Sequence, residues 1–140
     1  RMEERIEEGF IRDIHGDLHS GNIFLYRKPI LFDCIEFNDV YRRIDVLSEL
    51  AFFCMDLDAH NQPGLEEPFL EAYQRNFTCF KKSEDKKLFL YYKCFRANVR
   101  AKVHAIAADQ ANDAVNYDHQ RTAWKNYVSL MQTYMQSFRL

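Results

Sequence analysis

Glycine is scarce in this 140-residue chain, and the four glycines, at positions 9, 16, 21 and 64, form no glycine-rich run. The phosphate-cradling patterns G-x-G-x-x-G and G-x-x-x-x-G-K-[ST] are therefore both missing. No strand-rich segment precedes residue 10. These absences exclude a nucleotide site built from a glycine-rich loop within the chain itself.

Other absences narrow the class of protein. There is no CxxC pair among the four cysteines, no apolar run of membrane length, and a net charge of only −2. We therefore expect reduced core thiols in a cytoplasmic protein that has neither a membrane nor a nucleic acid as its partner. A hydrophobic content of 47% with 15% aromatic residues predicts one domain, residues 1–140, with a substantial core.

The most informative stretch is the polar segment 14–22, Ile-His-Gly-Asp-Leu-His-Ser-Gly-Asn. It is followed by two short apolar runs, 23–26 and 30–32, separated by Arg-Lys-Pro, which predict strand, turn and strand. A hairpin of this kind brings Asp33 back beside the polar segment. We therefore expect Asp17, Asn22 and Asp33 to lie on one side of the hairpin.

The spacing of these residues fits a known pattern. Asp17 precedes Asn22 by five positions, as in the protein-kinase loop H-R-D-x-x-x-x-N, which is followed by an Asp after the next hairpin. Gly16 stands where those kinases have Arg. The form His-Gly-Asp-x-x-x-x-Asn, with Asp33 opening Asp-Cys-Ile-Glu, resembles the aminoglycoside phosphotransferase family of small-molecule kinases. The resemblance is specific from about Ile11 to Leu57.

The resemblance implies a role for each polar residue. Asp17 would be the catalytic residue, accepting a hydrogen bond from a hydroxyl and taking its proton late. Asn22 and Asp33 would supply hard oxygen ligands for Mg²⁺ that bridges the phosphates of ATP or another NTP. His19 and Ser20 would bind the γ-phosphate, or they would only order the loop. The competing structural reading makes Asp17 and Asn22 simple turn formers.

Further residues take supporting roles by the same resemblance. Phe24 and Phe32 would form the floor of an adenine site. His15 and Asp45 would support the loop, although Asp45 also fits a plain helix N-cap. Glu36 would contact the substrate or a second metal ion, or would simply be solvated.

The rest of the chain is read as helical. The fold class we expect is mainly α with a small β-hairpin (α+β), resembling the large C-terminal lobe of the protein-kinase-like fold without its N-lobe. Arg96 and Arg100 stand one turn apart, and we interpret them as a solvated face rather than as partners of buried acids or of an anionic ligand. The expected elements are helices at 1–8, 46–59, about 65–80, 87–108 and 118–138, a strand at 10–14, an irregular stretch at 38–43, a charged connector at 81–87 and a polar break at 109–118.

Several functions fit these features. In the first, the chain is a fragment of a longer phosphotransferase whose N-terminal lobe lies elsewhere, its acceptor is a small-molecule hydroxyl, and the chain alone is inactive. The acidic residues Asp109, Asp113 and Asp118 would attract a cationic acceptor, or would be merely solvated. The face left open by the missing lobe would allow self-association. In the second, the chain is a non-catalytic, kinase-derived binding module. A metal-dependent phosphoesterase built on residues 13–19 fits poorly, because successive residues of an extended segment face opposite sides.

Overall fold

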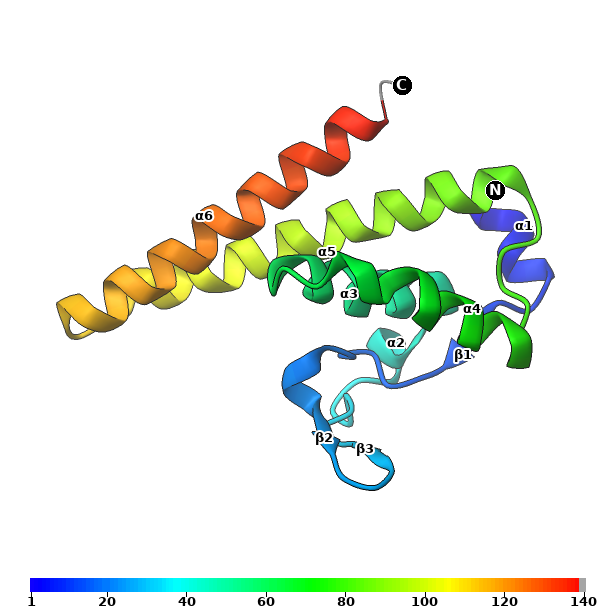
Figure 1. The fold of residues 1–140 in the computed structure, drawn as a ribbon, viewed down its shortest axis with the longest axis horizontal. Coiled ribbons are helices and arrows are strands. Elements are labelled where there is room, and N and C mark those ends of the chain that lie inside the picture. Colours follow the sequence, from blue (N-terminus) through cyan, green and yellow to red (C-terminus); the bar gives the residue numbers. More distant parts are fainter. Residues whose placement is uncertain (139–140) are drawn as a thin grey trace.

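The computed structural model describes residues 1–138 and shows a stack of helices from which a β-hairpin projects (Figure 1). Helices account for 67% of the residues and strands for 9%, so the mainly helical α+β class is confirmed. The elements are α1 (Met2–Glu7), β1 (Ile11–Asp13), η1 (Ser20–Asn22), β2 (Ile23–Leu25), β3 (Pro29–Leu31), α2 (Asp39–Arg42), β4 (Arg43–Asp45), α3 (Val46–Ala59), η2 (Pro63–Leu65), α4 (Glu66–Asn76), α5 (Ser83–Asp109) and α6 (Ala114–Ser137).

Helix α3 is the centre of the fold. It begins where the Asp45 carboxylate accepts a hydrogen bond from the Leu47 amide, at 2.8 Å, and it spans 46–59 as the sequence predicts. Apolar residues on nearly every face bury it between two hydrophobic clusters. One cluster joins α3 to Phe10, α4 and the start of α5, and the other joins α3 to α5 and α6. The position of α3 therefore sets the position of every segment that contacts it.

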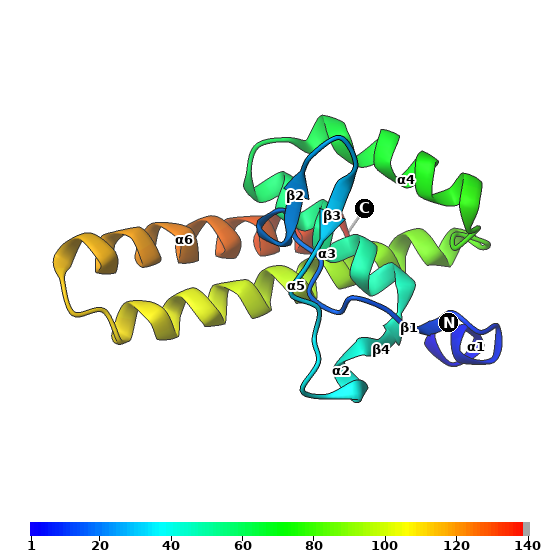
Figure 2. The ribbon, with the colours of Figure 1, turned by 90° about the horizontal axis from the view of Figure 1, so that it is seen from below.

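Helices α5 and α6 form a long antiparallel hairpin beside α3 (Figure 2). At 27 residues, α5 is roughly 40 Å long. Two expected boundaries are wrong here: α5 begins at Ser83 and not after the connector 81–87, and α6 begins at Ala114 and not near 118. In both cases a capping side chain starts the helix earlier. At α5 the Asp85 carboxylate accepts a hydrogen bond from the Lys82 amide at 2.9 Å, and at α6 the Asp113 carboxylate accepts one from the Asn116 amide at 2.8 Å.

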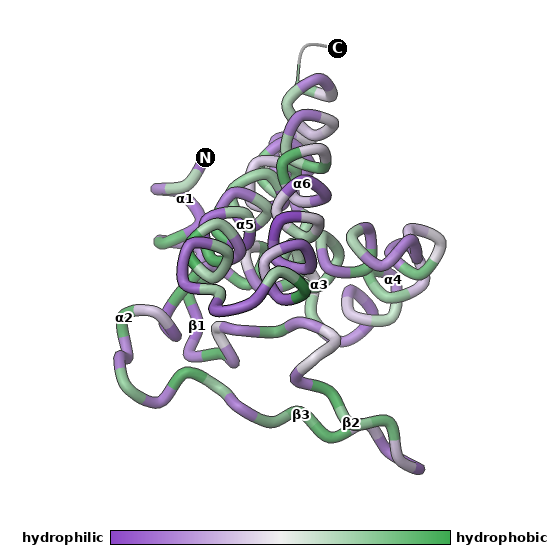
Figure 3. The backbone as a smooth tube through the Cα atoms, turned by 90° about the vertical axis from the view of Figure 1, so that its left-hand side faces the viewer, coloured by the Kyte–Doolittle hydropathy of each residue, from purple (hydrophilic) through white to green (hydrophobic). Residues whose placement is uncertain are grey.

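Two small antiparallel sheets flank the polar segment. Strands β2 and β3 form the expected hairpin, with Ile23 opposite Leu31 and Phe24 opposite Ile30. Strand β1 pairs with β4, with Ile11 opposite Asp45, so the stretch 38–43 is not irregular but forms helix α2 and the start of β4. Figure 3 shows β2 and β3 extending away from the helices, with hydrophobic residues along them.

A buried ionic cluster fastens the N-terminal helix to the rest. Arg5 is fully buried, and its guanidinium donates to the Asp45 carboxylate at 2.6 and 2.8 Å and to Asp85 at 3.1 Å. Arg1 also donates to Asp85, at 2.6 and 3.0 Å. Burial opposes ionisation of Asp85, but these bonds and the amides of residues 81 and 82 outweigh it, so its pKa lies below the ordinary value. The cluster joins α1, β4 and α5 through charge.

The remaining structural expectations concern cysteines and membranes. All four cysteines are free thiols; Cys54 and Cys79 are buried in the core, whereas Cys94 is half-buried and Cys34 is exposed. Core thiols are therefore confirmed for two of the four positions. Within residues 1–138, no helix combines the length and the apolar character needed to cross a membrane.

Replacing Arg5 by methionine tests the buried cluster. The change leaves two carboxylates without their shared buried cation, so we expect Arg5→Met to lower the free energy of unfolding by about 3–5 kcal/mol, measured by urea titration. The matched control is Arg75→Met, because Arg75 is exposed on α4. Equal stability of the two variants would contradict the assigned role of Arg5.

Candidate functional site

The candidate site is the polar loop, residues 15–22, which leaves β1 and enters the hairpin through η1. Its backbone passes along one side of α3. The Glu49 carboxylate accepts hydrogen bonds from the amides of His15, at 3.3 Å, and Gly16, at 2.9 Å. Two turns further along the same helix face, Asp56 accepts from the Ser20 amide at 2.8 Å. The loop is therefore attached to α3 at both of its ends, with Asp17 between the two attachments.

Gly16 is required by this arrangement. Its φ is +83°, in the left-handed region that favours glycine. A side chain there would also meet Ile35 at 3.0 Å and the carbonyl of Tyr41 at 3.1 Å. The small residue at this position thus lets the loop turn close beneath the segment that follows the hairpin.

The structure brings Asp17 and Asn22 into direct contact. The Asn22 Nδ2 donates to the Asp17 carbonyl at 3.0 Å and to the Asp17 carboxylate at 3.2 Å. Because both partners are acceptors, the amide nitrogen must face Asp17, which turns the Asn22 Oδ1 the other way. Within the described part of the chain, this Oδ1 has no hydrogen-bond partner.

His19 completes the surroundings of the Asp17 carboxylate. Its Nδ1 accepts a hydrogen bond from the Gly21 amide, at 3.2 Å, so the proton lies on Nε2, which faces Asp17 Oδ2 at 3.5 Å. This contact with His19 is the main cause that lowers the pKa of Asp17 below its ordinary value; burial acts in the opposite direction, and the charge of Arg100 adds to the lowering. The Asp17 side chain remains 41% exposed. A carboxylate that is ionised, oriented and open to solvent can act as a base.

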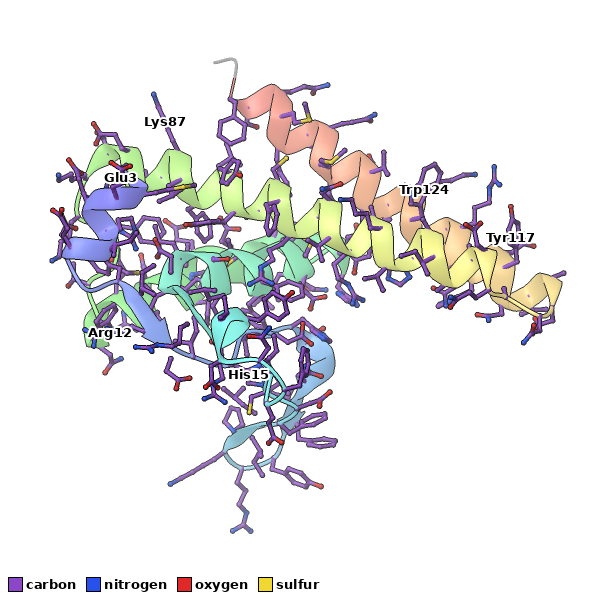
Figure 4. All side chains as sticks on the ribbon, turned by 180° about the vertical axis from the view of Figure 1, so that it is seen from behind. Glu3, Arg12, His15, Lys87, Tyr117 and Trp124 are labelled. Carbon is purple, nitrogen blue, oxygen red and sulfur yellow. The ribbon has the colours of Figure 1, made fainter. Side chains whose placement is uncertain are left out.

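His15 connects the loop to the segment after the hairpin. Its Nε2 donates to the Phe32 carbonyl at 2.7 Å, and its Nδ1 accepts from the Asp17 amide at 3.3 Å. In Figure 4 the labelled His15 lies between the helices and the hairpin. The structure thus places His15 as a scaffold residue whose two ring nitrogens hold backbone groups.

The backbone on both sides of Asp33 is hydrogen-bonded to the polar loop. The Phe32 amide donates to the Asn22 carbonyl at 3.1 Å, and the Ile35 amide donates to the His15 carbonyl at 3.1 Å. Asp33, between these two attachments, has a φ of +58°, a left-handed conformation that aspartate tolerates better than most residues. Its carboxylate is exposed. The hairpin therefore returns Asp33 to the same end of the loop as Asn22, as the spacing predicts.

The oxygen atoms offered by Asn22 and Asp33 are of the types that Mg²⁺ takes as ligands. The free Asn22 Oδ1 and the Asp33 carboxylate are hard oxygens, and magnesium in phosphotransfer sites takes one or two protein oxygens together with substrate phosphates. Within residues 1–138 there is no group of three or more His, Cys, Asp or Glu side chains arranged to hold a metal ion. The rest of the coordination of a magnesium ion here would come from phosphate oxygens and water.

Three other predicted site residues are placed as follows. Phe24 and Phe32 stack on each other, with ring centroids 4.4 Å apart, on the exposed face of the hairpin. Because side chains alternate along a strand, Ile23 and Leu31 point the other way, into an apolar cavity of about 420 Å³ beside α3. Glu36 is exposed.

The predicted loop support by Asp45 is not found. Among the described residues, its carboxylate bonds Arg5 and the Leu47 amide and makes no hydrogen bond to the loop. Glu49 and Asp56 hold the loop instead. Sequence reasoning missed both, although acids within a helix that is mostly apolar were a usable signal.

The interpretation of Arg96 and Arg100 as a solvated face is wrong. Arg96 donates to the Ser48 hydroxyl at 3.3 Å, its guanidinium lies 4.8 Å from the centre of the Phe52 ring, and its Nε is buried without a partner among residues 1–138. Burial lowers its pKa, opposed by the charges of Asp17 and Glu49. Arg100, one turn along, lines a cavity together with His19, Ser20 and Gly21 of the loop. Both arginines therefore belong to the surroundings of Asp17.

Comparison with known proteins yields relatives that are themselves uncharacterized. The chain is 37% identical over 121 residues to the uncharacterized protein Rv2004c of Mycobacterium tuberculosis and to the uncharacterized protein Mb2027c of Mycobacterium bovis. Each match covers 81% of this chain but only 23% of the relative. No protein-family model matches the chain. No solved structure matches it either. The chain therefore spans less than a quarter of the length of these curated relatives.

The attachment of the loop to α3 is tested at Glu49. In Glu49→Ala, two backbone amides lose a partly buried acceptor, which we expect to cost about 1–3 kcal/mol and to accelerate hydrogen exchange at residues 15 and 16. Glu71→Ala, which removes an exposed acid on α4, should change neither quantity. Unchanged exchange at Gly16 in Glu49→Ala would show that the loop does not depend on this carboxylate.

The protonation of Asp17 is tested by an NMR titration of its side-chain carboxyl carbon. We expect a midpoint below about 3.9, the ordinary aspartate value, and a rise toward that value in His19→Ala. Because the folded pKa is the lower one, ionised Asp17 stabilises the fold above the unfolded pKa, and this stabilisation is lost as the pH falls through the folded pKa. A midpoint that does not move in His19→Ala would rule out the contact as the cause.

Proposed function

We propose that this chain is the catalytic lobe of a phosphotransferase that moves the terminal phosphoryl group of ATP, or of another NTP, to a hydroxyl of a small molecule. The observation that carries the proposal is the contact between Asn22 Nδ2 and the Asp17 carboxylate, at 3.2 Å. It fixes a base beside a free amide oxygen, and the backbone next to Asp33 is hydrogen-bonded to Asn22, because the Phe32 amide donates to the Asn22 carbonyl at 3.1 Å. A turn needs only one of these residues, whereas phosphoryl transfer uses all three.

Each residue has a defined part in the proposed reaction. Asp17 accepts a hydrogen bond from the acceptor hydroxyl, orients its oxygen toward the phosphorus, and takes its proton late in the transfer. His19 lowers the pKa of Asp17 and holds its carboxylate in position, while the exposed Ser20 offers its hydroxyl to the terminal phosphate. Asn22 and Asp33 are the protein ligands of Mg²⁺, which when bound neutralises phosphate charge.

The exposed face of the hairpin supports the same proposal. Three residues share it, Phe24, Ile30 and Phe32. Each is more than a third exposed, although the two phenyl rings stack on each other. We propose that the adenine ring lies on Phe24 and Phe32, covered by an N-terminal lobe. The mycobacterial relatives are more than four times as long as their matched region, so the lobe has room to lie elsewhere in a longer protein.

The catalytic role of Asp17 is tested by substitution in the longer protein. Asp17→Asn keeps the shape but removes the base, so we expect ATP-dependent transfer to fall by about 10²–10⁴-fold while nucleotide binding is retained. Asp39→Asn is the matched control, because the Asp39 side chain is 77% exposed on α2. A full rate in Asp17→Asn would be incompatible with the proposal. Retained nucleotide or ligand binding in a wild-type protein that shows no transfer would favour the non-catalytic binding module.

A further inference from the structure

A second cavity opens on the other side of the loop, away from the hairpin. It has a volume of about 350 Å³ and is lined by the loop itself, the end of α3, and the facing sides of α5 and α6. His19, Ser20 and Gly21 form the wall nearest to Asp17. If Asp17 is the base of the proposed reaction, an acceptor hydroxyl that reaches it lies in or beside this cavity.

The positive charge in this cavity comes from Arg100. Its Nη2 lies 3.3 Å from His104 Nε2, and its guanidinium lies 5.6 Å from the centre of the Tyr127 ring. Within residues 1–138, Arg100 forms no salt bridge. A guanidinium has five N–H donors in a fixed plane, so most of its donor capacity remains available for a ligand.

The groups that contact Arg100 hold it in place without neutralising it, while the Asp17 carboxylate interacts with it through charge. His104 Nδ1 donates to Gln120 Oε1 at 2.7 Å, which leaves Nε2 as the acceptor that faces Arg100. The His104 ring stacks on Tyr127, with centroids 5.3 Å apart. The result is a cation fixed between α5 and α6 by neutral partners.

The one carboxylate that lines the cavity is already engaged. Asp56 is almost fully buried and accepts from the Ser20 amide at 2.8 Å, while its other oxygen lies 3.5 Å from His60 Nδ1. The remaining titratable lining residues are His19, His60 and His119. The acids considered for a cationic acceptor, Asp109, Asp113 and Asp118, do not line this cavity.

We infer that the acceptor molecule carries an anionic group, a carboxylate or a phosphate, that pairs with Arg100 while its hydroxyl reaches Asp17. The inference rests on the proposed function and adds to it the chemical class of the acceptor. It runs opposite to the cationic acceptor that the acidic residues of the sequence suggested. Arg100 would be a specificity-determining residue, because a guanidinium binds planar or tetrahedral oxyanions with two parallel hydrogen bonds.

Four probes that share one carbon skeleton but differ in charge test whether the acceptor is anionic: glycerol, 3-amino-1,2-propanediol, glycerate and glycerol 3-phosphate. Each is titrated into the chain without nucleotide, and the ring resonances of His60, His104 and His119 are followed by NMR. We expect one or both anionic probes to shift these resonances where the neutral and cationic probes do not. Comparing glycerate with glycerol 3-phosphate tells which oxyanion is preferred.

Variants assign the binding to Arg100. Arg100→Gln should weaken binding of the anionic probe by about tenfold or more. Arg100→Lys keeps the positive charge and should weaken binding less, which distinguishes loss of the charge from misfolding of the variant. Arg121→Gln, on α6 outside this cavity, should bind as the wild type does. Binding that is indifferent to probe charge, or unchanged in Arg100→Gln, would overturn the inference.

Transfer assays in the longer protein separate this inference from the proposed function. ATP-dependent transfer to the cationic probe but to neither anionic probe would overturn the anionic class and leave the phosphotransferase proposal standing. Binding of an anionic probe that depends on Arg100, with no transfer to any hydroxyl, would overturn the phosphotransferase proposal while the cavity keeps its assigned ligand class.

Discussion

Two carboxylates on one face of α3 accept hydrogen bonds from backbone amides of the polar loop, and the geometry of the site depends on this attachment. Glu49 holds the amides of His15 and Gly16, and Asp56 holds that of Ser20. The loop has almost no apolar side chains of its own to bury, so its shape is set by these hydrogen bonds rather than by packing. Burial raises the pKa of Glu49, opposed by the bonds from Gly16 and His15. The helix that forms the core therefore also determines where Asp17 lies.

Helix α3 is itself fixed by charge at its N-cap and by apolar packing along its length. Asp45 caps the helix and at the same time receives the buried Arg5 guanidinium, so the N-terminal segment and the helix start share one anion. Further along, Asp58 pairs with Lys93 of α5 at 2.7 Å and accepts a hydrogen bond from the Tyr134 hydroxyl of α6. The acids of α3 thus divide by helix face: Glu49 and Asp56 face the loop, and Asp58 faces the helical hairpin.

Sequence patterns predicted α1, α3, α4, α5 and α6, the β2–β3 hairpin and the contact between Asp17 and Asn22, because these depend on periodicity, turn residues and spacing over short distances. They missed the short helix α2. They did not predict the β1–β4 pairing, in which Ile11 lies opposite Asp45, because pairing between distant strands depends on tertiary packing. Local propensity also could not show that Arg96 and Arg100 face inward. Their stripe is polar in sequence, and only the position of α3 and the loop turns it into the lining of a site.

The single side chain of Asn22 has to satisfy two opposite demands. Toward Asp17 it must supply hydrogens, at 3.0 and 3.2 Å, and away from Asp17 it must present a lone pair. An isosteric acid at this position could not do both. Two carboxylates in contact would repel each other and titrate as one coupled pair, with one of the two pKa values raised. The amide at position 22 therefore lets Asp17 titrate on its own, with no second acid competing for the same proton.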